Sequence, residues 1–422
     1  MAIFNVELKQ HTPIIHFQHY QRGATLRASE LKPKLDKFLI KYFTEKDIDY
    51  KKWLIGNGEH NALNYRVKII QGKDSNIRDG KVITVTNRYP LFFGNMGKNY
   101  KNYETIKKFV FYEGSINVIF SSFDDKLLSY IKENISNFLA LENFGSRQDK
   151  GFGSFYISNL EIDKELFNHN FTLNVEGSSC EDKFRNLFKQ LDLFYKAIRS
   201  GINLKDRKGN TTIYFKSLLF LYFKQRGIQW EKKTIKQKFF LNDYNSYLGL
   251  CSQIKKYPKS DVLSYNSENK KLVKDLLGLS TKEAWTYYKN RIKKTEAKNV
   301  DGKWVKKDKN VDKDIIERFK SPIFFKIIEN KTEQKTISYT IYIKLNDDIP
   351  IRGKWFIIEE KNGNNFPLQI PSDFKLTEFF NFIINKDNFN INKHVDTQFY
   401  NCGEYKILEN IFNQLQNNNG TK

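Results

Sequence analysis

The stretch LENFGSRQDKGFGSFYISNL, residues 141–160, sets three glycines and two cations between two segments with ordered patterns. Glycine lets backbone amides approach an anion closely, and a neighbouring arginine and lysine add positive charge. The stretch therefore predicts a loop that contacts a sugar-phosphate backbone. A tight connection that needs positive φ angles explains the same glycines, so both interpretations stay open. The loop residues concerned are Gly145, Arg147, Lys150, Gly151 and Gly153.

The segments before this loop read as strand, helix, two strands and helix, and a last strand follows it. Apolar residues alternate in IFNVELKQ, LNYRVKII and SFYISNLEI, and in KKFVFYEGSINVIFSS around a short turn. They recur at helical spacing in ASELKPKLDKFLIKYF and in DDKLLSYIKENISNFLALENF, where Asp124 is a candidate cap. This order predicts a ferredoxin-like domain over residues 1–175, an arrangement also found in RNA-recognition domains.

The rest of the chain predicts a helical segment and a second domain, so the expected fold class is α+β. Long helical candidates are CEDKFRNLFKQLDLFYKAIRSG, TIYFKSLLFLYFKQRG and STKEAWTYYKNRIKK. The lysine-rich KKTEAKNVDGKWVKKDKNVDKD predicts an exposed loop, which completes a middle segment over residues 176–310. Strand patterns in PIFFKIIE, TISYTIYIKL and KWFIIEE, and a helical one in DFKLTEFFNFIINK, predict a second, shorter ferredoxin-like domain over 311–422.

The charge of the chain points to a polyanionic partner. The formal net charge is +23 and the isoelectric point is near 9.5, which favours nucleic acid or an anionic membrane surface. No apolar run approaches the roughly 20 residues that cross a bilayer, and MAIFNVELKQ lacks the form of a signal peptide. We therefore expect a cytoplasmic protein without a membrane partner. Membrane or general polyanion binding would explain the charge but not the loop.

Neither a metal nor a cofactor is expected. Cys180, Cys251 and Cys402 are too few and too far apart for a disulfide framework or a cysteine-rich zinc site. Histidines and carboxylates show no tight ligand spacing. The glycines are not a nucleoside triphosphate loop, because no Gly-Lys-Ser or Gly-Lys-Thr sequence opens a helix after them.

FGSRQDKGFGSFYI resembles the glycine-rich loop of the RAMP superfamily of CRISPR-associated proteins. The likeness is strongest to the family of first subunits of the Cmr (type III-B) effector complex. ELKQHTPIIHF is similar to that family's opening strand, GATLRASELKPKLDKFLIKYF to its arginine-bearing turn and first helix, and RFKSPIFFKII to the strand that opens its second ferredoxin-like domain. The first helix departs from the family pattern, because Pro33 and Lys34 stand near the usual glycine and the tryptophans are missing.

The resemblance implies a non-catalytic subunit of an antiviral ribonucleoprotein that holds the 3′ part of the CRISPR RNA. Its implied partners are the CRISPR RNA and other Cmr subunits, and target RNA is a partner that the resemblance leaves open. Arg27 has an alternative role in a salt bridge to Glu30 or Asp36. Besides the loop residues, the candidate RNA-binding residues are Arg27, Lys32, Arg88, Lys98, Arg318 and Lys320.

The alternative function is a metal-independent CRISPR RNA-processing endoribonuclease of the same superfamily. His16 and His19 follow the first strand, where such enzymes carry a general base, and His19 would take the proton of a ribose 2′-hydroxyl. A histidine on an alternating strand is more often a packed residue. The glycine-rich loop of those enzymes is also expected near the C-terminus, whereas here it closes the first half. The binding subunit is therefore the favoured hypothesis.

Overall fold

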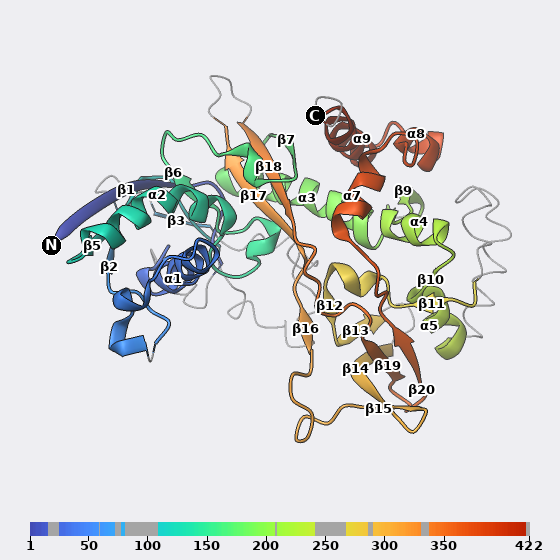
Figure 1. Cartoon of the computed structure of the whole chain (residues 1–422). Helices are drawn as coiled ribbons and strands as arrows, with labels where there is room; N and C mark the ends of the chain where they lie inside the picture. The colour runs from blue at the N-terminus through green and yellow to red at the C-terminus, as the bar shows by residue number, and fades with distance from the viewer. Residues whose placement is uncertain are drawn as a thin grey trace. The chain divides into compact units, whose positions relative to one another are not determined.

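Figure 1 shows the computed structural model of the chain. It forms two compact units, which are described separately. The first unit comprises Met1–Phe188 and Phe324–Lys344, and the second comprises Lys189–Ile323 and Leu345–Lys422. The structure describes residues 1–15, 25–58, 60–71, 77–80, 109–206, 209–240, 267–285, 290–330 and 337–418.

A four-stranded antiparallel sheet organises the first unit. Its strands follow the order β2-β5-β1-β6. Along β1, Val6 and Leu8 are buried while Asn5 and Glu7 are exposed, which is the period-two alternation of a sheet with one covered face. The four strands are β1 (Ala2–Gln10), β2 (Arg66–Gln71), β5 (Ile116–Ser122) and β6 (Phe155–Ile157).

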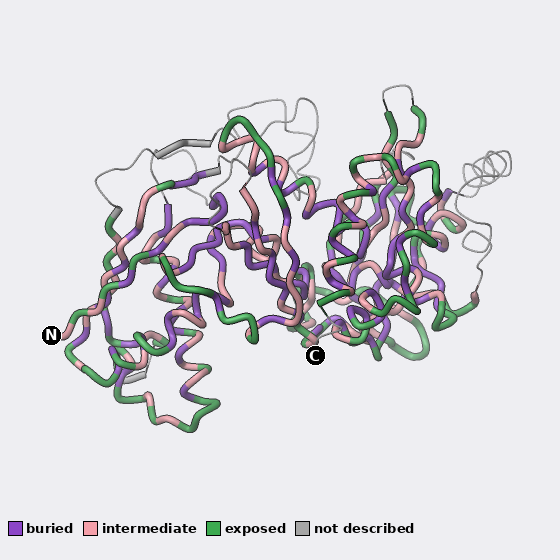
Figure 2. The backbone as a smooth tube through the Cα atoms, turned by 90° about the horizontal axis from the view of Figure 1, so that it is seen from above, coloured by how far each residue is buried: buried purple, intermediate pink, exposed green. Residues whose placement is uncertain are grey.

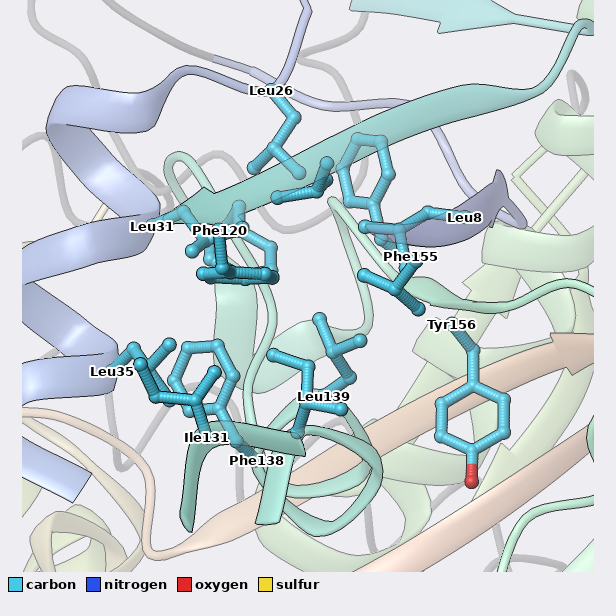
Figure 3. Packing of buried hydrophobic residues seen from close by; sticks show 14 of the residues in the cluster. Leu8, Leu26, Leu31, Leu35, Phe120, Ile131, Phe138, Leu139, Phe155 and Tyr156 are labelled. Carbon is cyan, nitrogen blue, oxygen red and sulfur yellow. The ribbon is translucent and has the colours of Figure 1, made fainter. Parts of the chain in front are cut away.

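Two helices, α1 (Ala28–Glu45) and α2 (Asp125–Leu141), cover the buried face of this sheet. Leu31 and Leu35 of α1 are fully buried, as are Ile131 and Phe138 of α2. Figure 3 shows these side chains meeting Leu8, Phe120 and Phe155 of the sheet. The predicted cap is confirmed, since the Asp124 carboxylate accepts from the backbone N–H of Leu127 at 2.8 Å.

Late residues of the sequence complete the first unit. A three-stranded sheet has the order β17-β18-β7, so β18 pairs in antiparallel register with a strand that lies far earlier in the chain. A separate antiparallel pair joins β3 and β4. The bounds are β3 (Ile77–Gly80), β4 (Phe109–Tyr112), β7 (His169–Val175), β17 (Ile323–Glu329) and β18 (Ile337–Leu345).

The second unit is built on a seven-stranded sheet. Its order is β10-β11-β20-β19-β14-β13, and β15 pairs with the C-terminal end of β14, while β13 pairs with its N-terminal end. Two further antiparallel pairs join β8 to β9 and β12 to β16. The bounds are β8 (Ile202–Lys205), β9 (Thr211–Phe215), β10 (Gln229–Trp230), β11 (Lys270–Lys271), β12 (Leu279–Ser280), β13 (Lys282–Trp285), β14 (Asn290–Val300), β15 (Lys303–Lys306), β16 (Arg318–Phe319), β19 (Trp355–Glu360) and β20 (Asn365–Gln369).

Helices supply the remaining core of the second unit. Tyr222 of α4 packs its ring against Phe379 and Phe382 of α7, with centroids 5.2 and 5.5 Å away. Figure 2 shows buried residues running along the strands and along one side of the helices. The helices are α3 (Cys180–Arg199), which begins in the first unit, α4 (Leu218–Gln225), α5 (Glu231–Phe239), α7 (Leu376–Ile384), α8 (Ile391–His394) and α9 (Gly403–Asn417).

The mixed α+β class is confirmed, but two predictions about the middle of the chain are wrong. Residues 280–294 were predicted to form a helix, and their described part consists of strands. Residues 293–314 were predicted to be an exposed loop, and they contain most of β14 and all of β15. The reason is that Lys294 and Glu296 point into the unit and are buried, so the polar pattern concealed a strand.

One local signal in this region was missed. Asp301 and Gly302 join β14 to β15 with φ angles of 50° and 81°. An Asp-Gly pair with both φ angles positive is the preferred two-residue turn of a β-hairpin.

No helix in the described part of the chain is both long and apolar enough to cross a membrane.

Candidate nucleic-acid interface

The glycine-rich loop runs from the end of α2 to β6 and has an unusual backbone. Gly145, Gly151 and Gly153 have φ angles of 81°, 83° and 67°, and Arg147 has a φ angle of 60°. A Cβ atom on Gly153 would lie 1.9 Å from the carbonyl oxygen of Phe144. These positions therefore require glycine for backbone geometry and space, which supports the tight-connection interpretation.

The amide groups of the three glycines already have acceptors within the first unit. Gly145 N–H donates to the Glu30 carboxylate at 2.5 Å. Gly151 N–H donates to the carbonyl of Gln148 at 3.1 Å, and Gly153 N–H to the carbonyl of Pro13 at 2.8 Å. A phosphate could use these amides only by displacing protein acceptors. An anion contact at the loop therefore depends on side chains. Arg147 and Lys150 are half-buried residues, and the ammonium nitrogen of Lys150 is itself buried, so Arg147 is the better placed of the two.

Two lysines from other elements hold the loop in place. Lys34 of α1 donates to the carbonyl of Asn143 at 2.5 Å, lies 3.2 Å from the Glu142 carboxylate and also donates to Gln148. Lys326 of β17 is fully buried and donates to the carbonyls of Glu142 and Phe155 at 2.9 Å each and to Asn143 Oδ1 at 3.2 Å. Burial lowers the pKa of Lys326 well below its ordinary value.

Neither lysine was predicted to be part of the site. Lys34 appeared only as a departure from the family pattern, and its contacts explain why a lysine is useful there. The available signal for Lys326 was its place inside the apolar strand IFFKIIE, where a charged side chain is unusual.

The other predicted residues have different surroundings. Arg27 precedes α1 and is half-buried. Lys32 is engaged within the protein, because its ammonium donates to Asp36 at 2.7 Å and to the Leu63 carbonyl at 2.9 Å. It also lies 4.3 Å from the ring centroid of Tyr65. Burial raises the pKa of Asp36, and its bond to Lys32 opposes that shift.

The remaining candidates are divided between the second unit and positions without a description. Arg318 and Lys320 are exposed at and just after β16, in the second unit, while the glycine-rich loop belongs to the first. Arg88 and Lys98 lie outside the described residues. His16 and His19, the candidates of the endoribonuclease hypothesis, also lie outside them.

The nearby histidine that the structure describes, His11, has a packing role. It is buried, and its Nδ1 accepts from the backbone N–H of Glu329 at 3.1 Å. Burial, and repulsion from Lys9 and Lys326, lower its pKa to about 3, so the ring is neutral at pH 7. Within the described ranges, no group of three or more metal-ligating side chains comes together.

Comparisons with known proteins identify two matching domain families. The model of the Cmr1 N-terminal domain matches residues 1–202, and that of the Cmr1 C-terminal domain matches residues 214–417. A search of curated proteins finds no match. Among solved structures, the crystal structure of Cmr1 from Pyrococcus furiosus in its apo form is similar at 11% identity, over 82% of this chain and 89% of that one, with a TM-score of 0.35.

Proposed function

This chain belongs to the Cmr1 family of type III-B CRISPR effector subunits, and from that membership we propose that it is a non-catalytic subunit that binds the 3′ part of the CRISPR RNA. Family membership implies assembly with other Cmr subunits. The RNA contact is proposed at the glycine-rich loop, where Arg147 and Lys150 lie on a backbone whose carbonyls accept hydrogen bonds from Lys34 and Lys326. The net charge of +23 agrees with a polyanionic partner.

We infer further that the first unit is a ferredoxin-like domain. Its support is the sheet order β2-β5-β1-β6, with α1 after β1 and α2 after β5. The second ferredoxin-like domain remains a proposal from the sequence pattern of residues 311–422, and so do the boundaries at 175 and 310. The strands of that C-terminal segment join more than one sheet, since β18 pairs with β7 while β19 pairs with β14 and β20.

Charge reversal in the loop tests the RNA contact. The double variant Arg147→Glu/Lys150→Glu should bind CRISPR RNA more weakly than the wild-type chain, measured by fluorescence anisotropy over a series of salt concentrations. Each lost phosphate contact should reduce the slope of log K against log salt by about 0.7. Lys41→Glu/Lys46→Glu is the matched control, because both lysines are exposed near the end of α1.

The result is informative if both variants unfold at the temperature of the wild type. An unchanged affinity of the loop variant would remove Arg147 and Lys150 from the RNA surface. Wild-type binding that does not distinguish CRISPR RNA from scrambled RNA would contradict the proposed function itself. Cleavage of repeat RNA by the wild-type chain without metal would instead support the endoribonuclease.

A further inference from the structure

Residues from five strands of the second unit form one row across its sheet. In register, Lys271 of β11 pairs with Gln369, Gln369 with Trp355, Trp355 with Ala297, and Ala297 with Lys306 of β15. Directly paired residues project to the same face of a sheet, as do residues two positions apart on one strand. Figure 1 shows β14, β15, β19 and β20 side by side. The row therefore defines one face of this sheet.

Along the first half of β14 this face is exposed, whereas the other face is buried. Arg291 and Lys293, three and two alternations before Ala297 on β14, are exposed, while Ala297 itself is buried beside the tryptophan of β19 with which it pairs. The residues between them point the other way, and Ile292 and Lys294 are 1% exposed. The alternation along β14 thus separates a buried face from a basic, hydrated one.

Cations dominate the open face. Lys282 pairs with Lys293 and is also exposed, and Lys271 and Lys306 belong to the row described above. Among the paired strand residues described on this face, the acidic one is Glu359, whose carboxylate lies 2.7 Å from Lys306. The excess of positive charge is complementary to a polyanion and unfavourable for a basic or neutral protein surface.

Two tryptophans are stacked in the middle of this basic surface. Trp304 of β15 pairs with Asn299, two positions after Ala297, so it projects to the same face as Trp355. The two indole rings are 4.1 Å apart between centroids, with an interplanar angle of 19°, and both residues are half-buried. The ammonium of Lys271 lies 5.8 Å from the Trp355 centroid.

This combination has a clear physical use. Large aromatic rings that stay partly in water on an open sheet are ready to stack on further rings. Sheet surfaces that bind single-stranded nucleic acid stack bases on aromatic side chains while neighbouring cations neutralise phosphates. We call the surface formed by Lys271, Arg291, Lys293, Trp304, Lys306 and Trp355 the tryptophan face.

We propose that the tryptophan face binds single-stranded RNA, with a base stacked on the Trp304–Trp355 pair and phosphates next to the surrounding cations. The inference rests on the proposed function for the class of partner. It adds a second contact surface, on a different unit from the glycine-rich loop, and a contact with bases in addition to phosphates.

The test compares a 16-nucleotide oligouridylate with an abasic oligonucleotide of the same length, using the full chain and fluorescence anisotropy. Trp304→Ala should weaken binding of the oligouridylate about 10-fold and should leave the abasic oligonucleotide nearly unaffected, since stacking needs a base. Trp304→Phe should restore part of the lost affinity. Arg291→Ala/Lys293→Ala should weaken binding of both oligonucleotides and reduce the salt slope.

The controls come from the same hairpin. Lys303→Ala and Val305→Ala change exposed residues of β15 that project to the other side of the strand, and neither should alter affinity. Equal oligouridylate affinity of Trp304→Ala and the wild type would overturn the inference. A second result would also overturn it: Trp304→Ala or Arg291→Ala/Lys293→Ala no longer binds another Cmr subunit but keeps the RNA affinity of the wild type. The face would then be a protein interface. Failure of wild-type RNA binding altogether would contradict the proposed function rather than this surface alone.

Discussion

The Lys326 ammonium donates to the carbonyl oxygens of Glu142 and Phe155, 2.9 Å away in each case, and so joins the two ends of the glycine-rich loop. The side chain of Asn143 is its third acceptor, at 3.2 Å. Three oxygen atoms around one ammonium match the three N–H groups that a lysine can donate. A residue of a distant strand therefore sets the conformation of the loop.

Replacing Lys326 with methionine should lower the free energy of unfolding by about 3 kcal/mol, because buried oxygens lose their donor. Chemical denaturation of the full chain measures the change. Lys344→Met is the control, since Lys344 donates to one carbonyl, that of Leu166 at 2.7 Å, and is only partly buried. A loss at Lys326 no larger than the loss at Lys344 would contradict the role assigned to Lys326.

The loop glycines should tolerate alanine much less well than a glycine in an open turn. Gly153→Ala puts a Cβ atom 1.9 Å from the Phe144 carbonyl at a φ of 67°, so we expect a loss of more than about 2 kcal/mol. At Gly302, with a φ of 81°, a Cβ atom would meet nothing within 4 Å. Gly302→Ala should therefore cost about 1 kcal/mol, from backbone strain alone. Thermal unfolding of the two variants compares these losses, and similar values would mean that the loop relaxes around the added methyl group.

The helices and strands of the first unit were predictable because apolar residues recur within each of them at the spacing of a helix or a strand. Helix α1 was expected from residue 28 and begins at Ala28, and the cap at Asp124 was also expected. The loop was found as a feature, and two interpretations of its glycines were left open. Their amides donate to Glu30, Gln148 and Pro13, which supports the tight connection. Glu30 and Pro13 come from distant parts of the chain, so the sequence pattern of the loop does not reveal them, while Gln148 is a local acceptor within the loop.

The middle of the chain was misread because some of its buried residues are charged. Lys294 is 1% exposed and its ammonium contacts the Asp275 carboxylate at 2.6 and 2.9 Å. A hydrophobic pattern treats such a position as surface, so β14 was missed. The tryptophan face was hidden for a related reason, since only strand register brings Trp304 beside Trp355.

Acid should destabilise the protein through its buried neutral histidines. The pKa of His11 is lowered from 6.5 to about 3. For His394, burial outweighs its bond to the Lys216 carbonyl and lowers the pKa from 6.5 to about 4. The unfolded chain binds these protons first, so the stability present above pH 6.5 is lost as the pH falls towards the folded-state values.

A shift from 6.5 to about 4 corresponds to about 3 kcal/mol. Urea unfolding at pH 7, 5.5 and 4.5 measures the decline. His11→Asn should flatten it, because the Asn side-chain oxygen can replace Nδ1 as the acceptor for Glu329 without taking up a proton. His60→Asn, at an exposed position, should leave the decline as it is in the wild type. A decline that His11→Asn does not reduce would assign the acid sensitivity to other groups.

The buried charges of the second unit should behave as one network. Lys294 contacts Asp275 at 2.6 Å and Glu283 at 3.3 Å, and these carboxylates raise its pKa against the opposing effect of burial. Lys294→Met leaves both carboxylates without this partner inside the unit, so we expect a loss of about 3–5 kcal/mol in the free energy of unfolding.

Two comparisons separate burial from simple charge pairing. Lys41→Met breaks an exposed pair with Glu45, 3.6 Å apart, and should cost less than about 0.5 kcal/mol. Asp275→Asn/Lys294→Met should recover part of the stability that Lys294→Met loses, because one uncompensated buried charge is removed with the other. Denaturant titration of these three variants and of Asp275→Asn alone completes the test. If the loss in the free energy of unfolding of the double variant equalled the sum of the losses of the two single variants, Lys294 and Asp275 would contribute independently. The buried charges would then not act as one network.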